Sequence, residues 1–377
     1  MKLYKKAILP KGFLASGIAC GIKRKKLDLG LIFSQKKSMA KCMFTVNKIQ
    51  AAPIIVNKKH LKASREFQAI IVNSGNANCF NGQAGIKDAK ETALSLAKLL
   101  KLRQRNILLA STGIIGKRIP LNKIKAGLPE LIQRLSRAGI NTLKKAIMTT
   151  DTFPKEATAV FNIGNKKINI CGIAKGAGMI APDLATMLVF IFSDVKISQM
   201  ALNKALKQAV ENSFNCISVD GCMSTNDSVM MLANAAAGNA IVDTNKNYAL
   251  FAKSLHAVCL ELARLIIKDA EGATKFLRIK IKGAQNFNQA KRAALGIANS
   301  NLFKTAMYGE SHNFGRIVAA LGSSGIAVSE KDIKIKVGAL NKKEINIEVE
   351  VNKGNSSCTV YTSDLTPEYI KINAEYN

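Results

Sequence analysis

A turn rich in glycine and other small residues runs directly into an apolar stretch at positions 175–190, KGAGMIAPDLATMLVF. A continuous apolar run bounded by turn residues is typical of a strand that is buried on both faces of its sheet. The segment therefore predicts a central strand covered by structure on both sides. It also places a threonine, Thr186, at the junction between the turn and the strand.

The rest of the chain mixes strand and helix patterns. Apolar segments that end in Asn, Gly or Pro predict strands, among them LDLGLIFS, CMFTVNK, AAPIIVN, FQAIIVN and NILLAS. Helical spacing predicts helices over 86–100, 121–136, 198–213, 249–267 and 288–300. Residues 275–284 predict a strand, and a period-two tail after residue 330 predicts a small, largely antiparallel sheet. We expect an α/β or α+β fold with a main domain over 1–285 and a small domain over 286–377.

Charge and cysteine content narrow the class of protein. The 377 residues carry a formal net charge of +31, but the lysines are scattered along the chain. This pattern favours a lysine-rich solvated surface over a nucleic-acid interface, because zinc-finger, helix-turn-helix and RNA-binding aromatic patterns are missing. The 8 cysteines form no CxxC pair, which argues against a disulfide framework or a zinc site. No apolar run approaches the ~20 residues of a membrane span, and the basic start meets a Pro-Gly turn, so we expect a cytoplasmic protein.

The residue inventory excludes several common catalytic designs. The 3 histidines occur without an HExxH pair, and no GxSxG motif frames a serine. The sequence KGAGM lacks both the phosphate-loop spacing and the third glycine of a dinucleotide fingerprint. We therefore expect no metal and no cofactor.

Thr186 raises a chemical question, because a hydroxyl is a poor nucleophile without an adjacent base. If the chain were cut between Ala185 and Thr186 by an N-to-O acyl shift, the released α-amine could accept the hydroxyl proton. A reference pKa of about 8 suits this amine to that role. From the residues alone, a structural threonine at a strand start stays an open interpretation.

The chain resembles the ornithine acetyltransferase (glutamate N-acetyltransferase) family of arginine biosynthesis. The segment at 175–190 is similar to that family's self-cleaving segment. Further similar blocks follow in the family's order, including FTVNKIQAAPI, VNSGNANC, STGIIG, AIMTTDTFPK, SVDGCMSTND, DAEGATK and KTAMYGESHNFGRI. They extend from near residue 10 to the end of the sequence.

The resemblance implies an activity. The precursor would cleave itself between Ala185 and Thr186 into an α chain and a β chain that stay associated as a heterotetramer of two α and two β chains. Thr186 would take the acetyl group of N2-acetylornithine and pass it to glutamate through an acetyl-enzyme. The resemblance leaves open whether acetyl-CoA also serves as a donor. It implies no nucleic-acid or membrane partner.

The resemblance also assigns roles to particular residues. Thr112 and Gly113 match an oxyanion-hole pair, which stabilises the negative charge of a tetrahedral intermediate. The substrate-binding positions match Thr149 (with Thr150 as the neighbouring alternative), Lys175, Thr186, Glu271 and Asn373. The family's further Thr or Ser, five residues after that Asn, would lie one residue beyond Asn377. Cys222 and Phe314 depart from the family's usual Asp and Trp.

The resemblance implies an αββα sandwich, with helices outside and two sheets inside, plus a smaller C-terminal α/β domain. N-terminal-nucleophile aminopeptidases share this kind of fold. An amidase or aminopeptidase, in which water replaces glutamate as acyl acceptor, is therefore the competing enzyme hypothesis. Two further hypotheses stay open, a basic nucleic-acid-binding protein and an uncleaved relative without activity.

Overall fold

The computed structural model describes residues 1–181, 187–244 and 246–375. It confirms a mixed α/β fold, organised as two compact units. The first unit comprises residues 1–176, 183–212 and 223–262, and the second comprises 177–182, 213–222 and 263–377. The second unit thus starts within a helix and gains two short segments from earlier in the chain. The division at residue 285 stays a prediction.

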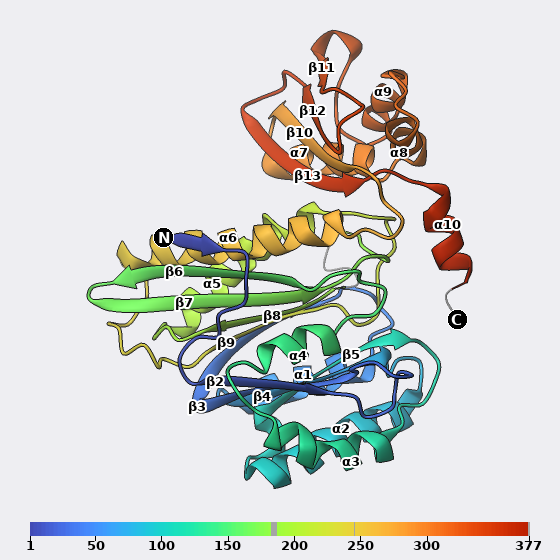
Figure 1. Ribbon diagram of the computed structural model, residues 1–377. Coiled ribbons are helices and arrows are strands. Elements are labelled where there is room, and N and C mark those ends of the chain that lie inside the picture. The colour runs from blue at the N-terminus through green and yellow to red at the C-terminus, as the bar shows by residue number, and fades with distance from the viewer. Residues whose placement is uncertain (182–186, 245, 376–377) are drawn as a thin grey trace. The chain divides into compact units, whose positions relative to one another are not determined.

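The first unit contains two sheets joined by one long strand (Figure 1). Strand β3 pairs with β2 and β4 near its start and with β9 over residues 39–44. The strand order is β1-β6-β7-β8-β9-β3-β4-β5, with β2 beside β3. The strands are β1 (Lys2–Tyr4), β2 (Phe13–Ile18), β3 (Leu29–Phe44), β4 (Phe67–Asn76), β5 (Ile107–Ile114), β6 (Lys155–Ile163), β7 (Lys166–Lys175), β8 (Leu188–Ser193) and β9 (Ser228–Ala233).

The two sheets of this unit pack face to face. Apolar residues from both sheets form one buried cluster, in which the Phe13 and Phe192 rings lie 5.5 Å apart. Helices cover the outer faces, so the layers form the expected αββα sandwich (Figure 1). The helices are α1 (Ala52–Ala63), α2 (Gly82–Leu100), α3 (Leu121–Gln133), α5 (Gln199–Glu211) and α6 (Lys246–Lys268). A further helix, α4 (Ile140–Ala146), contributes Ile140 and Leu143 to the buried cluster that the two sheets share.

Strand β8 is the central strand predicted by the apolar run. All six of its residues are buried. It pairs antiparallel with β7 and parallel with β9, and Leu188 lies opposite Lys175 on one side and Ser228 on the other. The end of β7 and the starts of β8 and β9 therefore lie side by side, where the chain enters β8.

The second unit contains a four-stranded sheet of order β11-β12-β10-β13, with helices packed on it. Two of its three strand pairs are antiparallel, as expected for most of the sheet, whereas β10 and β12 are parallel. Its elements are β10 (Phe276–Ala284), α7 (Phe287–Ala298), α8 (Asn301–Tyr308), α9 (Gly315–Gly322), β11 (Lys334–Val337), β12 (Glu344–Glu350), β13 (Ser356–Ser363) and α10 (Pro367–Ala374).

One strand prediction is wrong. The segment AAPIIVN forms the start of helix α1. Pro53 occupies the first helical turn, where its fixed φ favours a helix and its missing N–H costs nothing. Asn57, which the pattern assigns to the end of a strand, lies inside the helix. There it donates to the carbonyl of Leu109 and accepts from the Leu109 N–H.

Candidate active site

Thr112 and Gly113 lie at the end of β5, beside the end of β4. Gly113 has a φ of +131°, and a Cβ atom built on it would lie 2.3 Å from the carbonyl carbon of Gly75. Only glycine fits this position without displacing backbone. The close approach of the two strand ends therefore explains the glycine at position 113.

Lys175 reaches the same place from β7. Its side chain is buried, and its Nζ atom lies 3.4 Å from the hydroxyl of Thr112. The structure therefore brings together three of the residues predicted from sequence, Lys175, Thr112 and Gly113. A buried ammonium beside a hydroxyl can bind the carboxylate of a small substrate.

Thr149 joins this group through Asp151. One Asp151 oxygen accepts from the Thr149 N–H at 2.9 Å, and the other accepts from the Gly176 N–H at 2.7 Å and the Lys155 Nζ at 2.5 Å. Burial alone would raise the pKa of Asp151, but the charges of Lys175 and Lys155 hold it below the ordinary value. Asp151 is therefore an ionised carboxylate that binds the backbone N–H groups of both Thr149 and Gly176.

Lys23 adds a further positive charge. Its Nζ donates to the carbonyl of Met148 at 2.9 Å, and its side chain packs against Gly75. Burial lowers the pKa of Lys23 to about 8, although Asp28 acts in the opposite direction. Because Gly75 also contacts Gly113, this lysine lies close to the end of β5. Lys175, Lys155 and Lys23 all lie near the ionised Asp151, and this excess of cationic groups suits an anionic ligand.

Asn226 and Asp227 precede β9 and connect the two sheets at this edge. The Asn226 Nδ2 donates to the carbonyls of Ala77 and Ser111, at 2.7 and 2.8 Å. The Asp227 Oδ1 accepts from the Met187 N–H at 3.0 Å. Burial raises the pKa of Asp227 well above its ordinary value, against the lowering effects of the Met187 hydrogen bond and the Lys175 charge.

The predicted cleavage residues, Ala185 and Thr186, lie outside the residues that the structure describes. The chain is described again from Met187, which is buried at the entrance to β8. The described residue after the predicted nucleophile is thus held at the same edge of the sheet as Lys175.

Glu271 and Asn373 belong to the second unit. The Asn373 Nδ2 donates to a Glu271 carboxylate oxygen at 3.0 Å. A Cβ atom on Gly178 would lie 2.1 Å from the same Glu271 oxygen, so the carboxylate rests directly on glycine backbone. The structure brings these two predicted residues together, and a carboxylate with an amide beside it can bind an ammonium group.

A second acid of this unit holds the backbone near Gly178. Asp220 accepts from the N–H groups of Met179 and Ile180, at 2.7 and 3.0 Å. The Tyr369 hydroxyl also donates to it at 3.0 Å. Burial and the neighbouring Asp220 raise the pKa of the Tyr369 hydroxyl. Asp220 therefore fixes the turn on which the Glu271 carboxylate rests.

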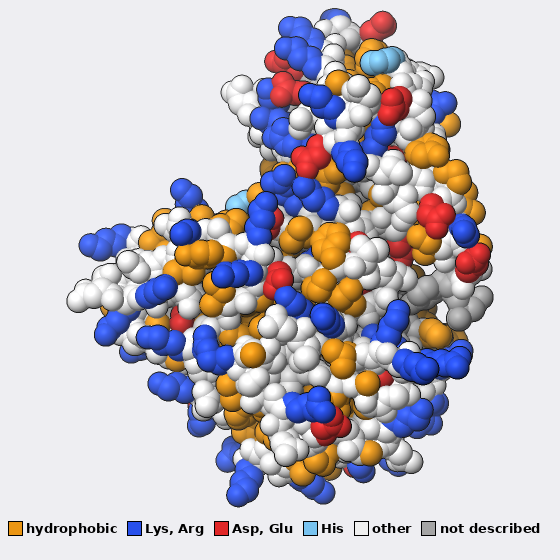
Figure 2. All heavy atoms as spheres, viewed as in Figure 1, with side chains coloured by type: hydrophobic (Ala, Val, Ile, Leu, Met, Phe, Trp, Pro, Cys, Tyr) orange, Lys and Arg blue, Asp and Glu red, His pale blue; other side chains and the backbone are white. Residues whose placement is uncertain are grey.

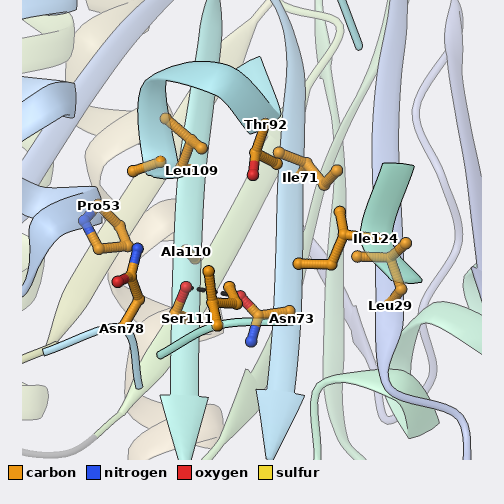
Figure 3. Close-up of a pocket in the computed structure, with 12 residues that line it drawn as sticks. Leu29, Pro53, Ile71, Asn73, Asn78, Thr92, Leu109, Ala110, Ser111 and Ile124 are labelled. Carbon is orange, nitrogen blue, oxygen red and sulfur yellow. Dashed lines mark hydrogen bonds between the residues drawn. The ribbon is translucent and has the colours of Figure 1, made fainter. Parts of the chain in front are cut away.

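Two cavities among the described residues are lined by neither Lys175 nor Thr112. Figure 3 shows one between β4, β5 and the neighbouring helices, where Ser111 donates to Asn73. Its volume of about 10 Å³ suits a single water molecule. A groove of about 840 Å³ runs beside β3 and α5 and contains none of the predicted site residues.

Within the described part of the chain, no group of three or more His, Cys, Asp or Glu side chains could hold a metal ion. His60 is buried, and its Nδ1 lies 2.7 Å from the carbonyl of Ile107 in a structural contact. No helix among the described residues is long and apolar enough to cross a membrane. Figure 2 shows the Lys and Arg side chains spread over the visible face.

Sequence reasoning missed four acidic or amide side chains: Asp151, Asn226 and Asp227 in the first unit, and Asp220 in the second unit. All four occur in blocks that carry the family resemblance, AIMTTDTFPK and SVDGCMSTND. A polar residue inside such a block was the available signal. Their backbone partners come mostly from distant segments, and those contacts could not be inferred from one sequence.

Comparison with known proteins identifies the family of the chain. Residues 14–377 match the model of the ArgJ family. The arginine biosynthesis bifunctional protein ArgJ of Caldanaerobacter subterraneus is 42% identical over 393 residues, covering 98% of this chain and 97% of the relative. The protein of the same name from Geobacter sulfurreducens is 41% identical over 389 residues, covering 97% of this chain and 99% of the relative.

Solved structures include relatives as well. The ornithine acetyltransferase of Mycobacterium tuberculosis, complexed with ornithine, is 35% identical with a TM-score of 0.45, covering 49% of this chain and 99% of that chain. ArgJ of Bacillus halodurans is 33% identical with a TM-score of 0.46, covering 50% and 98%. The family model spans nearly the whole sequence, and relatives above 40% identity do the same. The chain therefore belongs to the ArgJ family.

Proposed function

We propose that this chain is a cytoplasmic glutamate N-acetyltransferase of arginine biosynthesis, with N2-acetylornithine as acetyl donor and glutamate as acceptor. Membership of the ArgJ family supports the activity, since relatives above 40% identity bear the name arginine biosynthesis bifunctional protein. The observation that carries the proposal to particular residues is the contact of Lys175, which lies opposite Leu188 at the entrance to β8, with Thr112 at the end of β5.

The first step of the proposed mechanism is self-cleavage. The Thr186 hydroxyl oxygen attacks the carbonyl carbon of Ala185, the bond from that carbon to the Thr186 nitrogen breaks, and the hydroxyl proton passes to the nitrogen. Water then hydrolyses the resulting ester. This leaves a carboxylate on Ala185 and a free α-amine on Thr186, which serves as the general base.

Acetyl transfer then follows in two steps. The Thr186 oxygen attacks the acetyl carbon of N2-acetylornithine, and its proton passes through the α-amine to the departing nitrogen of ornithine. The α-amine of glutamate attacks the acetyl ester, and the Thr186 oxygen leaves and recovers a proton. Thr112 and Gly113 stabilise the oxyanion in both steps, a contribution of roughly 3 kcal/mol for each such donor.

In this proposal, cationic side chains bind the carboxylate of the substrate and an acidic side chain binds its ammonium group. Lys175, with the added field of Lys23, suits the α-carboxylate that donor and acceptor share. Glu271 and Asn373 suit the ammonium group of ornithine. Thr149 is held by Asp151 and completes the proposed set.

An acetyl-transfer assay tests the proposed function. Purified protein is incubated with N2-[¹³C-acetyl]ornithine, with and without glutamate, and the products are identified by NMR. We expect labelled N-acetylglutamate only when glutamate is present. Release of labelled acetate at the same rate in both samples would identify an amidase instead. Replacing acetylornithine by acetyl-CoA asks whether the enzyme also uses that donor, and light scattering tests the proposed heterotetramer.

A further inference from the structure

The carboxylate of Asp220 holds two separate segments of the second unit. Its Oδ2 accepts from the Met179 N–H at 2.7 Å and from the Tyr369 hydroxyl at 3.0 Å. Its Oδ1 accepts from the Ile180 N–H at 3.0 Å. One side chain therefore ties the turn at Met179 and Ile180 to helix α10, although Tyr369 lies 149 residues farther along the chain than Asp220.

The turn that Asp220 holds also supports Glu271. The Glu271 N–H donates to the carbonyl of Ala177 at 3.0 Å. A Cβ atom on Gly178 would lie 2.1 Å from one Glu271 carboxylate oxygen and 2.6 Å from the other. The carboxylate thus lies directly on the glycine, and its position depends on the position of the turn.

Helix α10 brings Asn373 to the same carboxylate. The Asn373 Nδ2 donates to a Glu271 oxygen at 3.0 Å and to the Tyr369 carbonyl at 2.9 Å. Residues four apart lie on the same face of a helix. The face of α10 that binds Asp220 through the Tyr369 hydroxyl is therefore the face that presents the Asn373 amide to Glu271.

Polar contacts hold α10 in place, because none of its residues is buried. The Thr366 hydroxyl, at the N-cap, donates to the Gly272 carbonyl at 2.7 Å. This contact fixes the start of the helix beside Glu271. The Tyr369 hydroxyl adds a second fixed point one turn later, and two such points set the orientation of the helix and hence of Asn373.

The two acids of this cluster differ in their charged surroundings. Burial lowers the pKa of Lys304 to about 8, against the raising effects of Asp364 and Asp220, so a buried cation acts on Asp220. Glu271 accepts from the neutral Asn373 amide, and no Lys or Arg among the described residues forms an ion pair with it. The uncompensated carboxylate is the one that suits a substrate ammonium group.

We propose that Tyr369 and Asp220 are positioning residues that give the enzyme its selectivity for a donor with a side-chain ammonium group. Asp220 holds the turn beneath Glu271, and the Tyr369 hydroxyl fixes α10 so that Asn373 orients the Glu271 carboxylate. Both act through Glu271 and Asn373 rather than on the substrate. This inference rests on the proposed function, since it takes N2-acetylornithine as the donor.

The test compares two donors that differ in the ammonium group alone. N2-acetylnorvaline has the side-chain carbons of N2-acetylornithine without the terminal amine. The selectivity of a variant is the ratio of kcat/KM for N2-acetylornithine to kcat/KM for N2-acetylnorvaline, with glutamate as acceptor. A hydrogen bond to a charged group is worth about a factor of 10 or more, so Glu271→Gln should lower the selectivity at least about 10-fold.

Tyr369→Phe keeps the ring and removes only the hydroxyl. We expect its selectivity to fall about 10-fold, with kcat/KM for N2-acetylnorvaline within about 2-fold of the wild type. Tyr308→Phe is the matched control, because Tyr308 lies on α8 of the same unit and is 44% exposed. It should keep the selectivity of the wild type.

A double variant separates positioning from a general structural role. A residue that acts through Glu271 has no effect on selectivity once Glu271 is replaced, so adding Tyr369→Phe to Glu271→Gln should leave the ratio unchanged. An unchanged ratio in Tyr369→Phe alone would overturn the inference, and so would equal losses for both donors or a further fall in the double variant.

If Tyr369→Phe does not fold, Asp220→Asn decides by the same ratio. Its amide nitrogen cannot accept from both the Met179 N–H and the Tyr369 hydroxyl, so the selectivity should again fall about 10-fold. An unchanged ratio, or the same loss with both donors, would contradict the proposal. A wild type that transfers no acetyl group from N2-acetylornithine to glutamate would instead refute the proposed function.

Discussion

A buried aspartate lies near each end of β8, and the two differ in how many of their carboxyl oxygens accept a hydrogen bond. At the far end, Asp194 accepts backbone N–H groups from Lys11 and Asn169 with its two oxygens. At the entrance, Asp227 accepts from Met187 with one oxygen, and its second oxygen is unpaired among the described residues. Burial raises the pKa of both carboxyls. The two ends of the strand are therefore held differently, the far end by two backbone N–H groups on Asp194 and the entrance by the Met187 N–H on Asp227.

The largest expected effect comes from removing the proposed nucleophile. We expect Thr186→Ala to leave one uncut chain and to reduce acetyl transfer by at least about 10³-fold, because the nucleophile is lost. Thr186→Ser keeps a hydroxyl and should retain part of both reactions. Denaturing electrophoresis and the transfer assay measure this. Finding two processed chains in the Ala variant would show that the Thr186 hydroxyl is not needed for cleavage.

Gly113→Ala tests whether the end of β5 takes part in the reaction proposed at the entrance to β8. The added methyl would meet Gly75 backbone, so we expect kcat to fall by about 100-fold or more as the proposed oxyanion donors move. Gly116→Ala is the matched control. Gly116 also has a positive φ, of +83°, but open space around it, so the variant should lose about 1 kcal/mol of stability and keep its activity. Equal losses of activity in both would contradict the assignment.

Asp151 extends the comparison to a buried aspartate that is ionised and whose two carboxyl oxygens both accept hydrogen bonds. Asp151→Asn should lower the free energy of unfolding by about 3 kcal/mol near neutral pH, because Lys155 and Lys175 lose a buried counter-charge. The folded pKa of Asp151 is depressed, so its contribution is present above the unfolded value of about 3.9 and is lost as pH falls through and below it. Denaturant unfolding between about pH 3 and 7 should show the two proteins converging at low pH. A constant difference would show that the charge does not matter.

Asp194→Asn should have the smallest effect. The amide nitrogen of asparagine cannot accept an N–H, so one of the two backbone hydrogen bonds is lost at a cost of about 1–2 kcal/mol. We expect normal processing and normal transfer, measured beside the thermal midpoint. Loss of processing in this variant would mean that the two ends of β8 do not differ in role.

Local patterns predicted much of the fold. The apolar run marked β8 because a strand covered on both faces needs no polar alternation. Helices α2 and α5 followed from their spacing, with bounds within a few residues. The run AAPIIVN was misassigned because short apolar segments suit either structure, and the contacts of Asn57 with β5 decided it. Likewise, the parallel pairing of β10 and β12 depends on contacts across about 70 residues of chain.

The site was less predictable than the fold. Resemblance supplied Thr112, Lys175 and Glu271, and the structure brings Lys175 to Thr112. Tyr369 could not be inferred, because its importance depends on a hydrogen bond to Asp220, 149 residues away in the chain. A single sequence shows which residues carry chemistry but not which of them meet after folding.

In the proposed mechanism, cleavage between Ala185 and Thr186 releases the α-amine that acts as the general base. Intact mass analysis of purified active wild-type protein, followed by N-terminal sequencing of the C-terminal fragment, tests it directly. We predict two polypeptides, residues 1–185 and 186–377, the second beginning with Thr186. Active protein that remains one polypeptide of 40.6 kDa would contradict the mechanism.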